Sequence, residues 1–282
     1  MLIGSIIAHK RSELHISREE LAKAIGVSPQ DISRWENNWS LPDIEQVGRI
    51  AEALHVGTGS LFNENPTEYS WEIHDQMFSA EHMFTRLKTI AEIKGLRETY
   101  KALYYARENH KDQLRKKPKF SDAKIPYISH PLMMACHAQS MGIDEDAVLA
   151  VILLHDVCED CGVSPDALPF SEEVRTAVDL LTKQKPDNIS KEEYTAQYYQ
   201  GIGSNRLASL VKIIDRCNNV STMALSFSDE KLSAYIDETE KYVLPLMSQM
   251  KRLYPDDNNV IFLVKYQILS VLESLKAMLM GR

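Results

Sequence analysis

Residues 155–160, HDVCED, gather one imidazole and three carboxylates within six positions. They follow an apolar run, AVLAVILL, whose composition predicts a buried helix. Helical spacing would place His155 beside Glu159 and Asp156 beside Asp160, so that the polar groups share one side of the helix end. Buried polar groups need partners or a function. This run is therefore the strongest indication of chemistry in the chain.

Two further segments offer groups that could complete a metal site. His130 precedes a proline that can begin a helix, and Asp215 and Asn219 are four positions apart on another predicted helix. Two imidazoles and two carboxylates suit a divalent transition ion that keeps positions open for water and phosphate. Manganese is the preferred interpretation, with iron or zinc as alternatives. Each group alone also fits an ordinary structural role, as a capped histidine, a surface aspartate or a helix ion pair.

In their order along the chain, four segments resemble the metal-dependent HD superfamily. Within it they are most similar to the small alarmone hydrolases and to the hydrolase half of the Rel and SpoT stringent-response enzymes. The segments are HKDQLRK (110–116), PYISHP (126–131), HDVCED (155–160) and KIIDRCNN (212–219). The resemblance extends from about Thr99 to the C-terminus and implies a helical phosphohydrolase domain.

The resemblance also implies a role for each matching residue. Glu159 and Asp160 match the acidic pair that activates water, Arg115 and Lys116 match a basic pair beside the nucleotide, and Asn219 matches a residue near the ribose. The implied ligands of the metal are His130, His155, Asp156 and Asp215. The implied reaction is manganese-dependent hydrolysis of the 3′-pyrophosphate of ppGpp or pppGpp, which yields GDP or GTP and pyrophosphate.

Some positions depart from that family pattern. The segment KPKFSDAKI, between Lys116 and Pro126, lacks the usual glycine and is slightly long, so guanine preference is less well supported than hydrolysis. Asn218 stands where the family often has an aromatic residue or histidine, which predicts altered local packing. Lys185 and Lys231 are weaker candidates for phosphate contacts.

The N-terminal residues show a different set of signals. Ser17 and Glu20 have the spacing of a capping box, and the helix they begin is expected to end at Gly26. Ser28-Pro29 begins a second helix, because proline is favoured at the first helical position. A short helix, a glycine turn and a second helix with a polar outer face predict a helix-turn-helix.

Residues 17–54 resemble the Cro and phage-repressor type of DNA-binding domain, with Asn38 in place of the usual glycine. The second helix is expected to bury Ile32 and Trp35. The candidate DNA-binding residues on its outer face are Ser28, Gln30, Asp31 and Arg34. Residues 1–63 carry six basic and eight acidic side chains, a net charge of −2. Since phosphate neutralisation dominates DNA affinity, we expect double-stranded DNA to be bound by a homodimer. The alternative is a module for dimerisation or partner contact.

Nearly all the secondary-structure elements that would position these site residues are predicted to be helices. The last helix shows apolar residues at three- and four-residue spacing from Ile261 to Leu279, and strand-like alternation is scarce. We therefore predict an all-α protein of two parts. The boundaries are 1–63 for the helix-turn-helix bundle, 64–98 for a linker and connecting helix, and 99–282 for the HD-type domain.

Composition restricts the class of protein. The 282 residues are 44% hydrophobic and 26% charged, with 32 Lys plus Arg against 40 Asp plus Glu, a net charge of −8. That sign does not suit a protein that mainly coats nucleic acid. The longest apolar stretch is far shorter than the roughly 20 residues of a membrane helix, and no secretory signal is visible, so we expect a cytoplasmic protein. Its four cysteines indicate reduced thiols, with a redox role for Cys158 and Cys161 as the minority alternative.

Other functions remain compatible with the same motifs. An HD nucleotidase or phosphatase could act on a different nucleotide. A transcriptional regulator could use the HD domain only to sense nucleotide. An antitoxin could remove a nucleotide made by a neighbouring toxin while the N-terminal module represses the operon.

Overall fold

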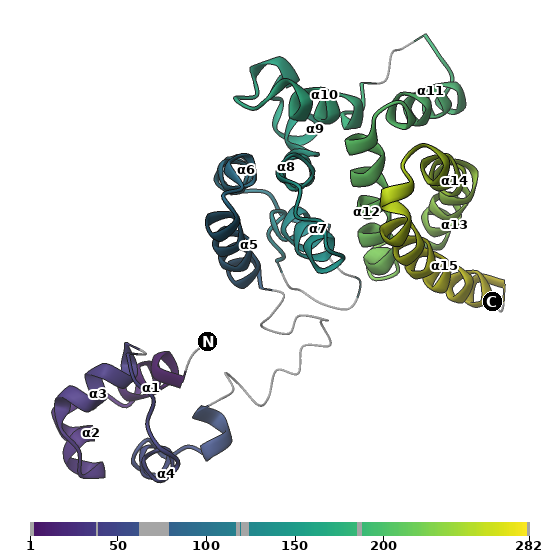
Figure 1. Cartoon of the computed structure of the whole chain (residues 1–282). Coiled ribbons are helices and arrows are strands. Elements are labelled where there is room, and N and C mark those ends of the chain that lie inside the picture. Colours follow the sequence, from purple (N-terminus) through teal and green to yellow (C-terminus); the bar gives the residue numbers. More distant parts are fainter. Residues whose placement is uncertain are drawn as a thin grey trace. The chain divides into compact units, whose positions relative to one another are not determined.

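The computed structural model describes residues 3–37, 39–61, 79–116, 119, 124–184 and 188–280. Within these ranges the chain is helical, and its one extended pairing is an isolated antiparallel bridge between Leu114 and Pro126. The all-α prediction is confirmed (Figure 1). The chain divides into two compact units, residues 1–76 and residues 77–282. The expected linker at 63–70, Asn38 and Lys185 lie outside the described residues.

The N-terminal unit contains four helices and a 3₁₀ turn: α1 (Ile3–Glu13), α2 (Arg18–Ile25), α3 (Pro29–Glu36), α4 (Ile44–Ala53) and η1 (Thr58–Leu61). The capping box at Ser17 is present, and Gly26 ends α2 with φ of +77°. Ile32 and Trp35 are buried in the core of this unit, as predicted. The inner face of α2 consists of Leu21, Ala22 and Ile25, which are buried.

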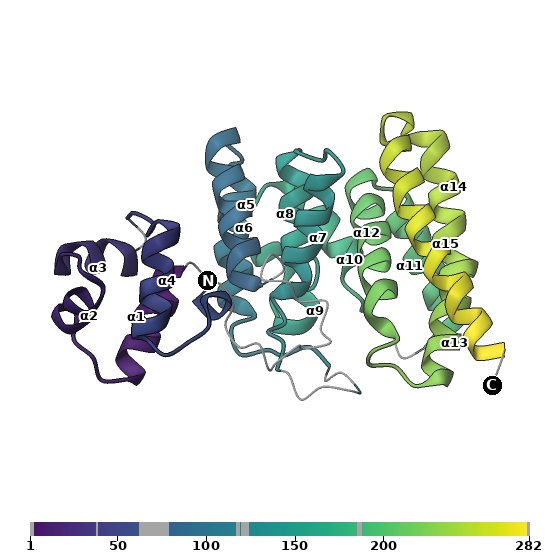
Figure 2. The same cartoon turned by 90° about the horizontal axis from the view of Figure 1, so that it is seen from below.

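The C-terminal unit is built around α8 (Asp146–Leu154), in which every residue from Val148 to Leu154 is fully buried. Four helices pack on α8: α6 (Arg97–Asn109), α7 (Ser129–Ser140), α10 (Glu172–Leu181) and α12 (Arg206–Met223). Figure 2 shows α7 and α8 side by side with α12 next to them. The apolar run AVLAVILL thus forms a helix enclosed on all sides, as its composition predicts.

The remaining helices enclose this centre. They are α5 (Ala80–Lys94), α9 (Val157–Cys161), α11 (Lys191–Gly203), α13 (Asp229–Glu238), α14 (Leu244–Leu253) and α15 (Asn258–Met280). A π-helical turn, Thr239–Val243, joins α13 to α14. Helix α15 packs on α12 and α14 through the apolar face predicted from its spacing, with Ile261, Val264, Ile268, Leu272 and Leu275 buried.

Helix α5 requires a correction to the predicted domain boundary. A connecting helix was expected within residues 64–98, and α5 ends at Gly95, whose φ is +69°. However, Met83, Phe84 and Leu87 are buried in the same core as α6 and α7. The C-terminal unit therefore begins near residue 77 rather than at 99, because α5 covers part of its hydrophobic core.

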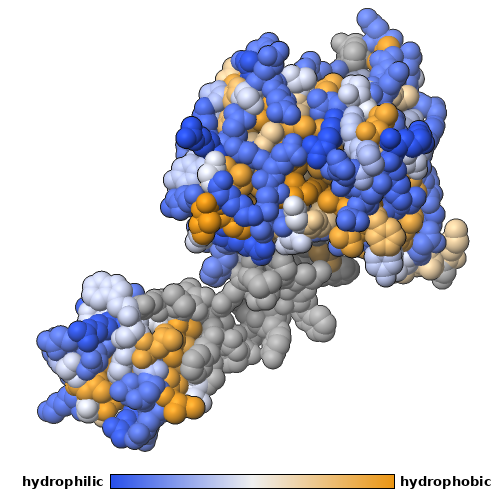
Figure 3. Space-filling model, viewed as in Figure 1, coloured by the Kyte–Doolittle hydropathy of each residue, from blue (hydrophilic) through white to orange (hydrophobic). Residues whose placement is uncertain are grey.

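On the faces visible in Figure 3, hydrophilic side chains predominate and apolar groups form scattered patches. None of the helices in the described ranges combines the length and the apolar composition needed to cross a bilayer.

Candidate metal centre

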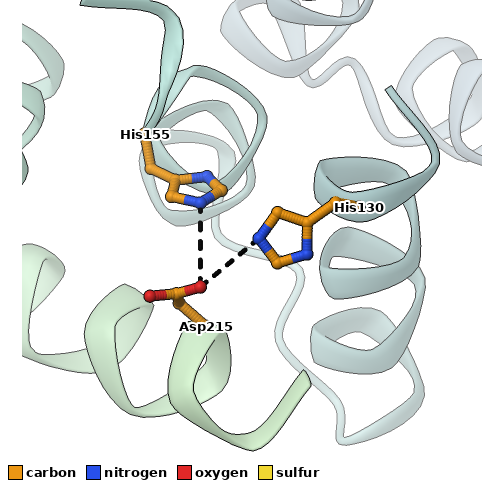
Figure 4. A group of neighbouring side chains, drawn as sticks. All are labelled: His130, His155 and Asp215. Atoms are coloured by element: carbon orange, nitrogen blue, oxygen red, sulfur yellow. Dashed lines mark ion pairs between the residues drawn. The ribbon is translucent and has the colours of Figure 1, made fainter. Parts of the chain in front are cut away.

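Three of the predicted metal ligands converge from three different helices. His130 lies in the first turn of α7, His155 directly follows α8, and Asp215 lies in the middle of α12. All three are buried, and their ligand atoms lie within 4.8 Å of one another. Nε2 of His130 is 3.3 Å and Nε2 of His155 is 4.0 Å from Oδ1 of Asp215 (Figure 4).

The outer nitrogen of each imidazole is occupied, which directs the inner nitrogen toward the centre. Nδ1 of His155 donates to the backbone carbonyl of Ile152 at 2.8 Å. Nδ1 of His130 donates to Oδ1 of Asn218 at 2.7 Å. In the neutral imidazole these bonds select the tautomer in which Nε2 carries a free lone pair, the form in which histidine binds metal.

The donor set fits a divalent cation. Nε2 of His155 is buried and makes no hydrogen bond in the described part of the chain, although Oδ2 of Asp156 lies 2.9 Å away. A buried imidazole nitrogen that faces carboxylate oxygens without a hydrogen bond fits a ligand of a divalent cation. Two imidazoles with carboxylates match transition-ion chemistry.

Asp156 borders this group of three. Its Oδ2 is 2.9 Å from Nε2 of His155 and 3.9 Å from Nε2 of His130, and its side chain is a quarter exposed. The hydroxyl of Tyr127 donates to the same oxygen. Asp156 therefore lies on the solvent side of the two imidazoles, within reach of an ion that they would hold.

The local backbone differs from the predicted single helix. Helix α8 ends at Leu154, His155 and Asp156 form a turn, and α9 begins at Val157. The expectation that His155 and Glu159 occupy one helix face is therefore wrong. The turn has a physical consequence: adjacent residues on a helix point about 100° apart, whereas here both side chains face the same centre.

A buried lysine compensates the charge of Asp215. Nζ of Lys212 donates to Oδ2 of Asp215 at 2.9 Å and lies 5.5 Å from the centroid of the Tyr198 ring. Burial alone would lower the pKa of Lys212, but the charge of Asp215 outweighs it and raises that pKa well above its ordinary value. Burial also opposes ionisation of Asp215, yet Lys212 and the two imidazoles hold its pKa well below its usual range. Both groups are therefore charged at neutral pH.

The predicted acidic pair, Glu159 and Asp160, lies on α9 and is exposed. Oε2 of Glu159 accepts a hydrogen bond from the backbone amide of Lys183 at 3.3 Å. Asp160 lies beside Tyr127, whose pKa rises because of burial and the carboxylates of Asp156 and Asp160. Tyr127 thus stays protonated and can donate to the carboxylates around it.

The predicted nucleotide contacts lie next to the ligands. Nδ2 of Asn219 donates to Oδ1 of Asp215 at 2.5 Å, and Nη2 of Arg115 donates to Oδ1 of Asn219 at 3.4 Å. Lys116 and Lys231 meet at one aromatic ring, with their Nζ atoms 5.7 Å and 4.0 Å from the centroid of Phe227. The structure therefore brings Arg115 and Asn219 to the metal ligands and places two lysines together at Phe227.

Three further residues contact the predicted ligands. No role was predicted for Tyr127 or Lys212, and Asn218 was expected only to alter local packing. The structure instead gives each a polar contact to a ligand: Tyr127 to Asp156, Lys212 to Asp215 and Asn218 to His130. For Lys212 and Asn218 the available signal was helical spacing, since both lie three positions from Asp215.

The four cysteines are free thiols. Cys158 is buried, and burial raises its pKa to about 11, as it does for Cys136 and Cys217. The less buried Cys161 donates to the carbonyl of Asn109 at 3.4 Å. At neutral pH these groups are protonated and poorly nucleophilic.

The predicted DNA-binding face lies on α3. Gln30 and Arg34 are exposed. The hydroxyl of Ser28 accepts from the amide of Asp31 at 3.2 Å and donates to its carboxylate at 2.7 Å. This second capping box occupies Ser28 and Asp31 in beginning the helix, whereas Gln30 and Arg34 are the exposed members of the predicted set that take no part in it.

Part of the positive charge of the N-terminal unit is neutralised internally. Arg11 and Arg18 both pair with the buried carboxylate of Glu36, at 2.6 Å and 2.5 Å. Lys10 pairs with Glu13 and Arg49 with Glu45. Of the six basic residues, only two have no carboxylate within 4.0 Å among the described residues of this unit: Lys23 and Arg34.

Comparison with known proteins gives separate matches for the two units. Residues 7–61 match a helix-turn-helix family. The chain is 32% identical over 157 residues to a GTP pyrophosphokinase rsh of Brucella melitensis, and 30% identical over 162 residues to a guanosine-3′,5′-bis(diphosphate) 3′-pyrophosphohydrolase of Aquifex aeolicus. These alignments cover 53% and 54% of the chain. The chain spans about one fifth of the length of these two relatives, 20% and 21%.

The match to a third relative covers a much larger share of that relative's length. The chain is 31% identical over 150 residues to guanosine-3′,5′-bis(diphosphate) 3′-pyrophosphohydrolase MESH1 of Xenopus tropicalis, a match that covers 50% of the chain and 80% of that protein. A solved structure of a metazoan ortholog of SpoT that hydrolyzes ppGpp has a TM-score of 0.50 at 20% identity, over 63% of this chain and 94% of that one. At that identity the structural likeness concerns the fold.

Proposed function

Because the C-terminal part of this chain belongs to the family of guanosine-3′,5′-bis(diphosphate) 3′-pyrophosphohydrolases that includes MESH1, we propose that the chain hydrolyses the 3′-pyrophosphate of guanosine polyphosphates. Water adds to the phosphorus nearest the ribose, and the bond from that phosphorus to the 3′ oxygen breaks. The products are GDP or GTP and pyrophosphate, and the 3′ oxygen gains a proton.

The convergence of the predicted ligand atoms is the main support for this proposal. One ligand atom from each of His130, His155 and Asp215 lies within 4.8 Å of the other two, and all three residues are buried. An exposed acidic pair, Glu159 and Asp160, follows directly in the chain. Ligand atoms directed at one point beside carboxylates that can accept a proton are the parts that metal-assisted hydrolysis of a phosphate ester requires.

The metal would be held by His130, His155, Asp215 and Asp156. Manganese is our choice of ion, because mixed imidazole and carboxylate ligands suit it. When bound, such an ion supplies Lewis-acid activation of phosphate and water.

The chain's own residues account for the remaining steps. Glu159, whose carboxylate is held by the amide of Lys183, or Asp160 would accept the proton of the attacking water. Arg115 would stack on the base, since a guanidinium plane suits a purine. Lys116 and Lys231, which meet at Phe227, would contact phosphates, and Asn219 would contact the ribose.

A turnover assay over a panel of nucleotides tests the substrate. In the presence of manganese, we expect pyrophosphate release from ppGpp and pppGpp, and at least a hundredfold lower kcat/KM on GTP, ATP and the corresponding 5′-monophosphates. The physical reason is that the metal centre must receive a 3′-pyrophosphate, and GTP, ATP and the 5′-monophosphates carry no phosphate at the 3′ position. Release of inorganic phosphate from the 5′-nucleotides without action on ppGpp would favour the HD nucleotidase or phosphatase. Tight nucleotide binding without turnover would favour a sensor.

A second function is supported by the N-terminal match to a helix-turn-helix family. The unit would bind double-stranded DNA, with Gln30 and Arg34 reading base edges. With only Lys23 and Arg34 free of carboxylate partners in the described part of this unit, one copy neutralises few phosphates. Two copies on an inverted repeat, with half-sites about one helical turn apart, would supply the affinity. An antitoxin that represses its own operon would combine both activities.

The charge pairing in this unit predicts a shallow dependence of DNA affinity on salt. Lys23, present once in each copy, gives a slope of about −1.8 for log K against log salt in the dimer, at 0.9 per phosphate. Arg34→Ala should abolish sequence preference in a selection from random DNA and leave that slope nearly unchanged, because Arg34 reads bases rather than phosphates. Lys23→Ala is the matched control, because it removes the same charge but no base contact.

Three results would contradict this second function. Failure of the full chain to enrich any sequence at low salt would make the unit a dimerisation or partner-binding module. Retention of sequence preference by Arg34→Ala would exclude α3 as the reading element. A slope much steeper than two phosphates allow would show that other cations bind DNA.

A further inference from the structure

We propose that Asn218 is a positioning residue for the metal centre, which holds the His130 ring in its metal-binding tautomer. This inference rests on the proposed metal site and adds a residue to it. Oδ1 of Asn218 accepts from Nδ1 of His130 at 2.7 Å, and both side chains are buried, with exposed fractions of 9% and 2%.

The position of Asn218 follows from helix geometry. Asp215 and Asn218 are three residues apart on α12, so their side chains lie on the same face of the helix. That face packs against α7, which carries His130. One helix therefore supplies a ligand, Asp215, and the group that orients another ligand across the interface.

The two imidazoles are held by different means, and this difference makes the inference specific. His155 donates to the backbone carbonyl of Ile152, which no substitution at a neighbouring position removes. His130 depends on a side chain. Without an acceptor there, the proton on the His130 ring can move to Nε2, the atom that faces Asp215 at 3.3 Å. A protonated Nε2 cannot bind a metal ion.

The test compares two variants of the full chain that differ only in the acceptor. Asn218→Leu keeps a similar volume without an acceptor, and Asn218→Asp keeps an acceptor oxygen and adds a negative charge. Titration with Mn²⁺ alone, in which calorimetry records the heat of binding, measures the dissociation constant of the ion without any nucleotide. Partners of this kind typically change metal affinity by about 10- to 100-fold. We expect Asn218→Leu to weaken Mn²⁺ binding by at least tenfold, and Asn218→Asp to bind as tightly as the parent or more tightly.

Cys217→Ala provides the matched control. Cys217 is the buried neighbour of Asn218, but its thiol faces Gln267 at 3.3 Å rather than His130. This variant should bind Mn²⁺ within about threefold of the parent. Thermal unfolding of the metal-free proteins identifies any variant that has lost the fold, and Asn218→Asp then decides the question, since it retains the polar partner.

Each remaining outcome has a definite meaning. Equal weakening by Asn218→Leu and Asn218→Asp would overturn the inference and assign Asn218 to packing. Parent-like affinity in a folded Asn218→Leu variant would overturn it as well, as would a parent chain that binds neither Mn²⁺ nor Zn²⁺. Normal metal binding by the parent with no turnover of ppGpp would instead count against the proposed substrate and leave the role of Asn218 intact.

Discussion

His155→Ala should lower turnover of ppGpp by at least about a thousandfold and remove the tightly bound metal from the purified protein. The variant loses one of three converging ligand atoms and leaves Asp156 without the nitrogen 2.9 Å away. Lewis-acid stabilisation is worth several kcal/mol, and each 1.36 kcal/mol changes a rate about tenfold. The measurements are metal content by elemental analysis and kcat at saturating manganese.

A histidine outside the site provides the control for that loss. His137 lies on α7, the helix that carries His130, but its side chain bonds with Gln267. His137→Ala should keep the metal and most of the activity. Near-normal metal content and turnover in a folded His155→Ala variant would show that the proposed site is wrong. Asp156→Ala is expected to behave like His155→Ala.

Glu159→Gln should retain the metal and lose on the order of a hundredfold or more in kcat. Glu159 is exposed on α9, and its carboxylate accepts from the amide of Lys183 rather than joining the three buried ligands. An amide cannot accept the proton of an attacking water, and general-base groups contribute about 10²- to 10⁴-fold. The measurement pairs kcat with metal content for the same preparation.

The control is an exposed glutamate elsewhere in the unit. Glu108 pairs with Lys111 at 2.7 Å on the surface, so Glu108→Gln should leave both quantities unchanged. If Glu159→Gln instead loses its metal and regains full activity at saturating manganese, Glu159 is a ligand and the proton acceptor is a different group.

The helices and their ends were largely predictable because local signals determine them. Ser17 with Glu20, Gly26, and the apolar run before His155 each act within a few residues of the chain, and the structure shows the capping box, the left-handed glycine and the buried helix. Motif order assigned four ligands to one site, and the donor atoms of three of them lie within 4.8 Å of one another.

The unpredicted features depend on contacts between distant segments. No periodicity reveals that α8 stops at Leu154, since the acidic residues beyond it could continue a helix as well as begin another. The partners of the ligands were missed because Tyr127 reaches Asp156 across 29 positions, and Asn218 reaches His130 across 88. Helix α5 was taken as a connector because its apolar residues do not show which helices they cover.

Lys212 determines the sign of the charge at the centre. Oδ2 of Asp215 accepts from this ammonium, so the charges of the pair cancel. Burial opposes protonation of His155, but the carboxylates of Asp156 and Asp215 raise its pKa to about 9, so His155 is protonated at neutral pH and offsets Asp156. A divalent cation that displaced this proton would bring the sum of these four groups and the ion to +1, whereas without the lysine the sum would be zero. The buried lysine would thus give a polyanionic substrate an attractive centre once the cation is bound.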